Sequence, residues 1–253
     1  MTSLLDLAAI SGCYLFPQPR CVKQPWIVPV DGAELACYRS HVDPSRFTLI
    51  HFHGNGEGVA DYIPWLPNKL SALGLNSIFV EYRGYGESTG QAQLAAMLGD
   101  GEAVMNAAGL RPEQVIAFGR SIGSLYAIEL VHRHPSVAGL ILESGIAEPA
   151  ERFLKYADLS GTGLTQDDVV AEARRTFNHQ QKLSGYHQPA LLLHTVYDGL
   201  VDISHAERNL QWLGGQQKKL IRFVNGDHNS ILGYNTVKYF EAIAEFVKSL
   251  EIG

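Results

Sequence analysis

Ser121 is the residue whose setting most clearly predicts chemistry. It lies at the centre of the run G-R-S-I-G (residues 119–123), between a strand-like stretch at 114–118 and a helical stretch at 122–134. A serine on such a tight turn requires glycine two residues away on each side, because larger side chains there would collide with neighbouring backbone. The pattern predicts that Ser121 is a nucleophile. It also predicts that the N–H of Ile122, at the positive end of a helix, stabilises negative charge on an attacked carbonyl oxygen.

A serine nucleophile needs a base that removes its proton and a carboxylate that orients this base. Asp198 follows an apolar run at 190–195, and His228 lies in a turn-rich loop after the last strand-like run. Asp202 is the rival of Asp198, but it directly precedes a helical stretch, where helix capping is the simpler explanation. The chain order Ser121, Asp198, His228 therefore predicts a catalytic triad, with His228 as general base and Asp198 as the residue that orients it.

A second N–H donor to the oxyanion is expected after an earlier strand. The run H-F-H-G-N-G (residues 51–56) ends in a glycine-rich turn, which predicts that the backbone N–H of Asn55 faces Ser121. His51 and His53 are two residues apart and should share one face of an extended strand, so metal binding is an alternative. Because the following residues supply no Asp and His in the pattern of a hydrolytic metal site, we predict structural roles for both histidines and no metal. The remaining histidines considered are interpreted as surface or cap residues: His132, His134, His179, His187 and His205.

Strand-like and helical runs alternate along the chain, which predicts a mostly parallel eight-stranded sheet with helices on both faces. The pair Asp31-Gly32 predicts a two-residue turn between two antiparallel edge strands. Several later strands are apolar throughout, as expected for strands that are buried on both faces. The expected strands are 26–30, 33–40, 48–53, 77–82, 114–118, 138–143, 190–195 and 220–224, and the expected helices are 62–73, 92–108, 122–134, 204–213 and 235–250.

The interval between Ser144 and Tyr186 interrupts this alternation. It is longer than a crossover requires and has helical character without a strand. We expect one domain over residues 1–253, with residues 145–186 forming a small helical cap. Four apolar residues of this interval either line an acyl pocket, the more economical interpretation, or contact a partner protein or a membrane surface: Phe153, Leu154, Tyr156 and Leu159.

Composition and charge exclude several classes of function. The net charge of −6 provides no basic field for nucleic acid, and no apolar run is long enough for a membrane span. The first residues carry Asp6 and no Lys or Arg before Arg20, unlike a secretory signal, so we expect a cytoplasmic protein. Three cysteines in no metal-binding pattern are expected to be reduced and mostly buried. The run I-S-G-C before residue 14 leaves lipidation of Cys13 as an alternative.

Five short runs carry a resemblance to a known family. They are H-G-N-G at 53–56, E-Y-R-G-Y-G-E-S at 81–88, G-R-S-I-G at 119–123, D-G-L-V-D at 198–202 and G-D-H-N at 226–229. With them the chain resembles the α/β-hydrolase superfamily along nearly all of its length, and most of all the branch that contains protein depalmitoylases and related bacterial hydrolases. The resemblance implies the α/β-hydrolase fold and esterase or thioesterase chemistry with the triad named above. The chain departs from this branch at His194-Thr195, where H-G is usual, and in the cap.

The residues and the resemblance together predict a serine hydrolase that cleaves an ester or thioester of a small-molecule or acyl substrate through an acyl-enzyme, without a cofactor. Cofactor-free haloperoxidases and carbon-carbon bond hydrolases use the same triad and stay open as alternatives. A non-catalytic binding protein that retains the fold is the alternative from another class.

Overall fold

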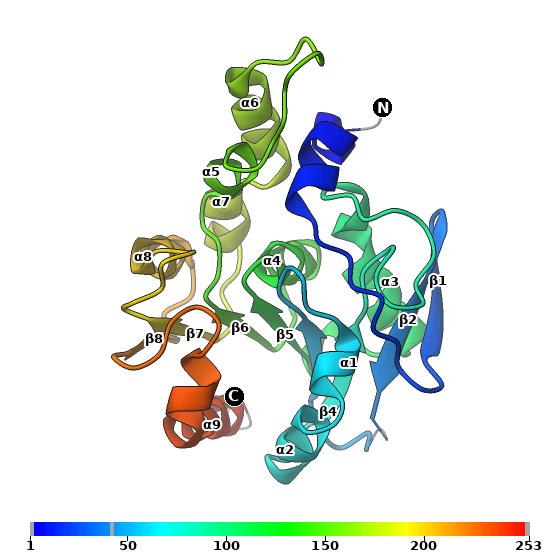
Figure 1. Cartoon of the computed structure of the whole chain (residues 1–253). Coiled ribbons are helices and arrows are strands. Elements are labelled where there is room, and N and C mark those ends of the chain that lie inside the picture. Colours follow the sequence, from blue (N-terminus) through cyan, green and yellow to red (C-terminus); the bar gives the residue numbers. More distant parts are fainter. Residues whose placement is uncertain (1–2, 41–42, 251–253) are drawn as a thin grey trace.

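The computed structural model describes residues 3–40 and 43–250, and its centre is an eight-stranded sheet (Figure 1). The strand order is β1-β2-β4-β3-β5-β6-β7-β8, with β1 and β2 antiparallel to their neighbours and all later pairs parallel. This architecture confirms the expected α/β-hydrolase fold class. The strands are β1 Trp26–Val30, β2 Ala33–Arg39, β3 Thr48–Phe52, β4 Asn76–Val80, β5 Val115–Arg120, β6 Gly139–Glu143, β7 Ala190–Thr195 and β8 Lys218–Phe223.

The hairpin at the sheet edge forms as the sequence predicts. Val30 pairs with Ala33, so Asp31 and Gly32 make a two-residue turn, and Gly32 has a φ of +74°. Such a turn needs positive φ, which glycine adopts without strain.

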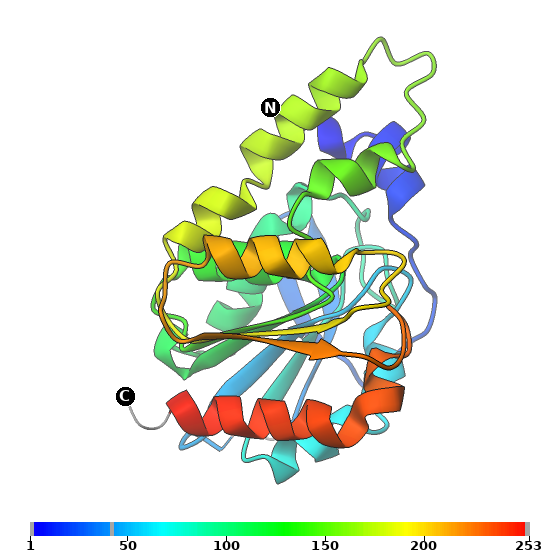
Figure 2. The same ribbon diagram turned by 90° about the vertical axis from the view of Figure 1, so that its left-hand side faces the viewer.

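Helices cover both faces of the sheet, as Figure 2 shows for α8 above it and α9 below it. The helices α3, α4 and α8 pack on one face, and α2 and α9 pack on the other. Between β6 and β7 lie the three helices of the expected cap, α5, α6 and α7. The helices are α1 Val59–Tyr62, α2 Leu66–Ala72, α3 Asp100–Ala107, α4 Gly123–Arg133, α5 Pro149–Leu154, α6 Gln166–Thr176, α7 His179–Ser184, α8 Ile203–Trp212 and α9 Ile231–Leu250, and the short helical turns are η1 Leu4–Asp6, η2 Ala8–Gly12, η3 Ala96–Gly99 and η4 Pro112–Gln114.

Three helix predictions are wrong in their bounds. The helix expected over 62–73 is two helices, α1 and α2, because Pro64 interrupts it and Pro67 lies in the first turn of α2. The helix expected over 92–108 begins only at η3. Helix α9 starts at Ile231, four residues before the expected start, and Asn235 marks a kink inside it with φ −124° and ψ 20°.

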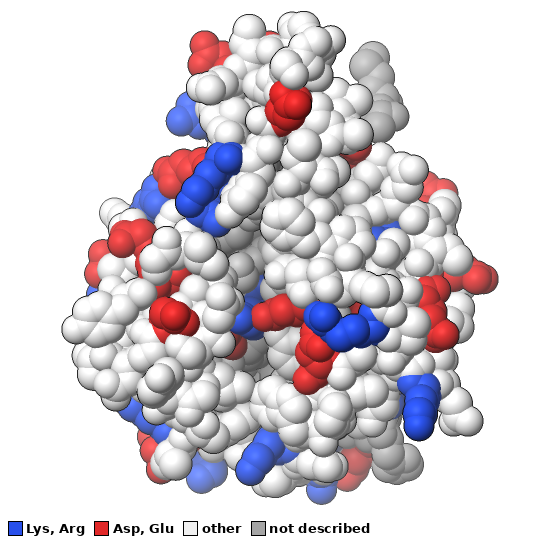
Figure 3. Space-filling view, viewed as in Figure 1, with Lys and Arg blue, Asp and Glu red and all other residues white. Residues whose placement is uncertain are grey.

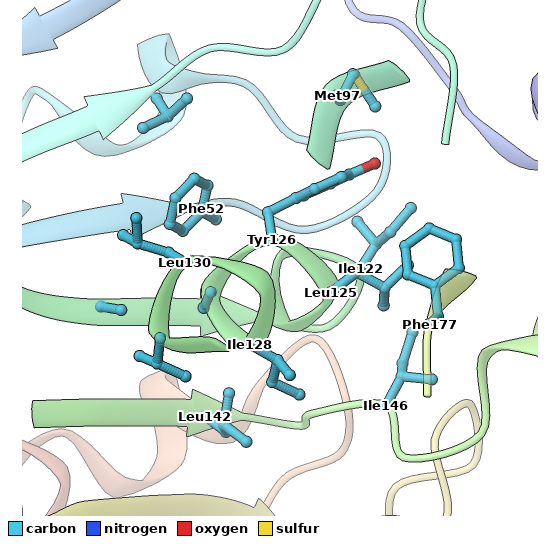
Figure 4. Packing of buried hydrophobic residues seen from close by; sticks show 14 of the residues in the cluster. Phe52, Met97, Ile122, Leu125, Tyr126, Ile128, Leu130, Leu142, Ile146 and Phe177 are labelled. Atoms are coloured by element: carbon cyan, nitrogen blue, oxygen red, sulfur yellow. The ribbon is translucent and has the colours of Figure 1, made fainter. Parts of the chain in front are cut away.

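Helix α4 lies at the centre of the core on one face of the sheet. Residues 123–131 of this helix are all buried, since the sheet, α3 and α7 surround it. Figure 4 shows Tyr126 and Leu130 beside Phe52, while Ile122 lies near Ile146 and Phe177. Burying a large apolar side chain contributes roughly 1.5–3 kcal/mol. The helix that follows Ser121 is therefore held firmly on the sheet.

The cap projects away from the sheet and contacts the N-terminal segment (Figure 2). Helix α6 contacts η1 and α5 contacts η2. The Ser3 hydroxyl donates to Glu172 at 2.6 Å, and the Asp158 N–H donates to the Ala9 carbonyl at 2.9 Å. The sequence analysis makes no structural prediction for residues 3–16. In the structure they pack against the cap.

Candidate active site

Ser121 occupies the strained turn between β5 and α4. Its φ is +51°, in the left-handed region that non-glycine residues rarely adopt. A Cβ on Gly119 would lie 2.6 Å from the Gly123 carbonyl oxygen, and a Cβ on Gly123 would lie 2.1 Å from the Phe52 carbonyl oxygen. Both glycines are therefore required by close backbone approach, for the reason that the sequence analysis gives.

The structure brings Ser121, His228 and Asp198 together from three separate loops. His228 Nε2 lies 3.0 Å from Ser121 Oγ, and His228 Nδ1 lies 2.7 Å from Asp198 Oδ2. The other oxygen, Asp198 Oδ1, accepts hydrogen bonds from the N–H groups of Leu200 and Val201, at 2.9 and 2.7 Å. This geometry lets Asp198 select the tautomer in which Nε2 of His228 is free to accept the serine proton.

The surroundings of Asp198 favour its ionised form. Burial raises the pKa of this carboxyl, but the hydrogen bond and charge of His228 and the Val201 N–H outweigh burial, so the pKa is lowered below its ordinary value. The rival Asp202 instead caps α8, where its Oδ1 accepts from the Ser204 N–H at 2.9 Å. Asp198 thus bonds His228 while Asp202 caps a helix, which are the positions that the sequence analysis expects for these two carboxylates.

Thr195, which stands where the resembling family usually has glycine, joins the loops that carry Asp198 and His228. The Thr195 hydroxyl donates to the Gly226 carbonyl at 2.9 Å. Asn235, at the kink of α9, donates from Nδ2 to the Asn225 carbonyl at 2.9 Å. Both contacts hold the turn that precedes His228, so the kink in α9 has a local function that its sequence alone does not indicate.

The two expected oxyanion donors lie beside the serine. Asn55 lines the same cavity as Ser121, and Ile122 follows Ser121 as the N-cap of α4. Within residues 3–40 and 43–250, neither backbone N–H has a hydrogen-bond partner, which leaves both able to donate to a ligand. The Asn55 side chain has a separate task, because its Nδ2 donates to the Tyr14 carbonyl at 2.6 Å and its Oδ1 accepts from the Phe16 N–H at 3.0 Å.

Arg120 is a buried residue of the cavity wall that the sequence analysis missed. Its side chain lies 2.8 Å from Glu57 and 3.5 Å from Glu143. One guanidinium nitrogen also donates to the His228 carbonyl at 3.2 Å. Glu57 in turn accepts from the Gly54 N–H at 2.6 Å, so this network joins the Asn55 loop, the serine turn and the His228 loop.

Electrostatics keep Arg120 charged, whereas burial opposes the ionisation of Glu143. Burial lowers the pKa of Arg120, but the charges of Glu143 and Glu57 outweigh it, so the pKa lies above its ordinary value. Burial raises the pKa of Glu143, which also accepts a hydrogen bond from the Tyr239 hydroxyl. A charged residue at the end of each of two adjacent buried strands, Arg120 on β5 and Glu143 on β6, was the available sequence signal.

A cavity of about 180 Å³ opens over Ser121. In Figure 3 this face of the molecule is hollowed near its centre, with acidic and basic side chains beside the hollow. The N-terminal segment and the cap close the cavity from above, since Tyr14 packs on Phe153 and Tyr156 with ring centroids 5.2 and 5.6 Å apart. The cavity is lined by Tyr14, Phe16, Gly54, Asn55, Glu57, Arg120, Ser121, Arg152, Tyr156, Leu200, His228 and Asn229.

The histidines outside the triad have structural surroundings. His51 packs among Tyr62, Phe79 and Phe118, whereas His53 lies against Tyr82 and within 2.8 Å of Glu81. The two histidines contact different residues, and only His51 lies within β3, which ends at Phe52. Among the residues that the structure describes, no three His, Cys, Asp or Glu side chains are grouped so that they could hold a metal ion.

Two further expectations need correction. His205 is neither a surface nor a cap residue, because it is buried on α8, where its Nδ1 accepts from the Ala147 N–H. His179 lies in the cap on α7, as expected, but it is buried and bonds the Ile146 carbonyl. Of the cysteines only Cys37 is buried, while Cys13 is partly exposed and Cys21 exposed, and all three are free thiols. Over the described ranges, no helix has the length and apolar character that crossing a bilayer would need.

Comparisons with known proteins agree with this fold. The sequence model of the family described as "Serine aminopeptidase, S33" matches residues 43–165. Alpha/beta hydrolase domain-containing protein 17B of Homo sapiens is 28% identical over 222 residues, covering 85% of this chain and 72% of that protein. Protein YfhR of Escherichia coli K12 is 26% identical over 236 residues, covering 89% of this chain and 76% of that protein.

Solved structures show the same fold at lower identity. Est1E from Butyrivibrio proteoclasticus, with ferulic acid bound, has a TM-score of 0.74 at 18% identity and covers 90% of this chain and 100% of its own. Esterase Pf2001 from Pyrococcus furiosus has a TM-score of 0.71 at 17% identity, covering 92% and 99%. A tight turn that carries a serine between a parallel sheet and a buried helix is typical of α/β-hydrolases. This chain belongs to the α/β-hydrolase superfamily. That membership supports hydrolase activity.

Proposed function

We propose that this protein is a serine hydrolase that cleaves an ester or thioester through an acyl-enzyme, without a cofactor. The observation that carries the proposal is the unbroken hydrogen-bonded chain from Ser121 Oγ through His228 to Asp198, at 3.0 and 2.7 Å. The cavity above Ser121 supports it, because a substrate carbonyl carbon has room next to the serine oxygen.

In the first step His228 Nε2 takes the proton of Ser121 as Oγ bonds to the substrate carbonyl carbon, and the carbonyl oxygen becomes an oxyanion. The N–H groups of Ile122 and Asn55 donate to this oxyanion, and the positive end of α4 lies beside it. The imidazolium that forms is stabilised by the ionised Asp198. The oxyanion then collapses, His228 returns its proton to the leaving alcohol or thiol, and the acyl group stays on Ser121.

In the second step His228 takes a proton from a water molecule, whose oxygen attacks the acyl carbon. Collapse of the second oxyanion releases the carboxylic acid, and His228 protonates Ser121. The Arg120 network supports both steps by holding the backbone of His228 and, through Glu57, the loop of Asn55 in one arrangement.

The test compares the wild-type protein with Ser121→Ala on 4-nitrophenyl acetate and on a butyryl thioester. Without the nucleophile we expect kcat/KM to fall by about 10³-fold or more on both substrates. Ser184→Ala, which alters an exposed serine at the end of α7, is the matched control and should retain full activity. Activity that survives in Ser121→Ala would contradict the nucleophile, and a wild-type protein that cleaves only peptide 4-nitroanilides would contradict the substrate class.

A further inference from the structure

Arg152 is a cation in the cavity for which the proposed mechanism has no use. It lies on α5, in the cap, and lines the same cavity as Ser121 and His228. One terminal nitrogen donates to the Leu200 carbonyl at 2.6 Å. Its Nε is buried and has no partner within residues 3–40 and 43–250. A guanidinium has five N–H donors, so donors remain for a ligand beside the Leu200 carbonyl and Tyr14, whose side chain also interacts with Arg152.

The charge of Arg152 is not balanced by the protein. Across the described residues, no carboxylate lies within ion-pair distance of it, and the adjacent Glu151 faces His205 and Arg208 instead. The other charges on the cavity wall are matched, because Arg120 is paired with Glu57. Arg152 is partly exposed, so water solvates its charge, and a ligand of opposite charge can take the place of that water.

The walls around Arg152 would strengthen its hold on an anion. Its guanidinium carbon lies 5.9 Å from the centre of the Tyr156 ring, and the rings of Tyr14 and Phe16 complete this side of the cavity. Aromatic walls displace water, and a hydrogen bond between charged groups is stronger where water is excluded. One guanidinium matches the single charge of a carboxylate better than the nearly double charge of a phosphate monoester.

We propose that Arg152 binds a carboxylate on the substrate, so that the preferred esters or thioesters are those of carboxylate-bearing molecules. The inference rests on the proposed function for its reaction, but the carboxylate site itself can be tested without turnover. Arg152 is in this view a specificity-determining residue of the cap, and the triad would process neutral and charged substrates by the same steps.

The experiment measures binding of stable amide analogues to the full-length protein by calorimetry. Glutaric acid monoanilide and pentananilide form a pair that differs by a carboxylate on the acyl side. The pair 4-acetamidobenzoate and 4-acetamidobenzamide places the carboxylate on the leaving-group side. In one or the other of these two pairs, we expect the charged member to bind about 10- to 100-fold more tightly than the neutral member. This is the range of a hydrogen bond to a charged group.

Variants connect this preference to Arg152. Arg152→Gln should remove the preference, Arg152→Lys should retain part of it, and neither should alter binding of the neutral analogues. Arg174→Gln removes the same charge from an exposed position of the cap and should change nothing. Equal binding of both members in both pairs would overturn the proposal, and so would an equal effect of Arg152→Gln and Arg174→Gln. Because no analogue is cleaved, these outcomes are independent of whether Ser121 is the nucleophile.

Discussion

The floor and the roof of the cavity are built on different principles. The floor consists of Ser121, His228 and Arg120. Ser121 lies on a strained turn, and a network of charges and hydrogen bonds holds Arg120 and the His228 backbone in place. The roof consists of Tyr14, Phe16, Arg152 and Tyr156, which aromatic contacts and few hydrogen bonds hold between two segments distant in sequence.

The difference separates reaction from selection. A polar network with every partner satisfied fixes positions to fractions of an ångström, as proton transfer requires. Aromatic packing tolerates changes of shape, so a roof of this kind can change its ligand while the floor keeps its chemistry. Changes in the floor should therefore affect all substrates alike, and changes in the roof should affect the ratio between substrates.

The largest expected effect is that of Asp198→Asn. The amide cannot hold His228 in the required tautomer, so kcat should fall by about 10⁴-fold on acetate and longer esters alike. Asp202→Asn is the control, since asparagine also caps a helix and the activity should remain unchanged. Steady-state kinetics on both variants checks this. A larger loss in Asp202→Asn than in Asp198→Asn would show that Asp202 is the acid of the triad.

The next effect concerns Arg120→Met, which leaves Glu57 and Glu143 without their cation. We expect the free energy of unfolding to fall by about 3–5 kcal/mol, because Glu143 stays buried without its cation and the Glu57 side chain is only 24% exposed. Arg133→Met is the control: the Arg133 side chain is 39% exposed against 9% for Arg120, so its loss should reach only about 1 kcal/mol. Urea unfolding measures both, and similar losses would show that the network beneath Ser121 contributes no special stability.

A smaller effect is expected from Tyr156→Ala, in the roof. Removing the ring widens the cavity, so the ratio of kcat/KM for 4-nitrophenyl butanoate to that for the acetate should change by about tenfold. The kcat for acetate should stay within about twofold, because the floor is untouched. Tyr234→Ala, at a tyrosine that is 71% exposed, serves as the control. A uniform loss on both esters would place Tyr156 in the floor rather than the roof.

The smallest effect is a pH dependence of stability in the cap. Burial lowers the pKa of His179 from 6.5 to about 3. The folded protein thus keeps His179 neutral while the unfolded chain binds a proton below about pH 6.5, so stability is full above that pH and falls as pH decreases toward 3. Between pH 7.5 and 5.5 the loss due to His179 should be about 1 kcal/mol.

His179→Asn retains an N–H donor for the Ile146 carbonyl and does not titrate, so its stability should fall less over this pH range. A remaining slope is expected from His205, whose pKa burial lowers to about 4. Substitution of the exposed His132 should leave the wild-type slope. An unchanged slope in His179→Asn would contradict the account of a neutral, buried imidazole.

Much of the floor could be predicted from the sequence because its signals are local. The glycines around Ser121, the turn before Ala33 and the strand-end positions of Asp198 and His228 follow from backbone sterics and chain order. The sheet follows from apolar runs that are too continuous for a half-exposed strand. Helix bounds were less accurate where prolines and the Asn235 kink override the apolar pattern.

The parts that escaped prediction depend on contacts between distant segments. Arg120 occupies a variable position of its motif, and only the fold shows that Glu57 and Glu143 meet it. Tyr14 and Phe16 belong to a segment without clear helical periodicity, and they reach the cavity because Asn55 binds the backbone there. No pattern in one sequence encodes such pairings.

The most direct test of the central claim is to map where a fluorophosphonate probe reacts. After labelling and digestion, mass spectrometry should find the adduct on the peptide that carries Ser121, and His228→Ala should slow labelling by orders of magnitude. Labelling at another residue, or equal labelling of the wild-type protein and the Ser121→Ala variant, would contradict the account.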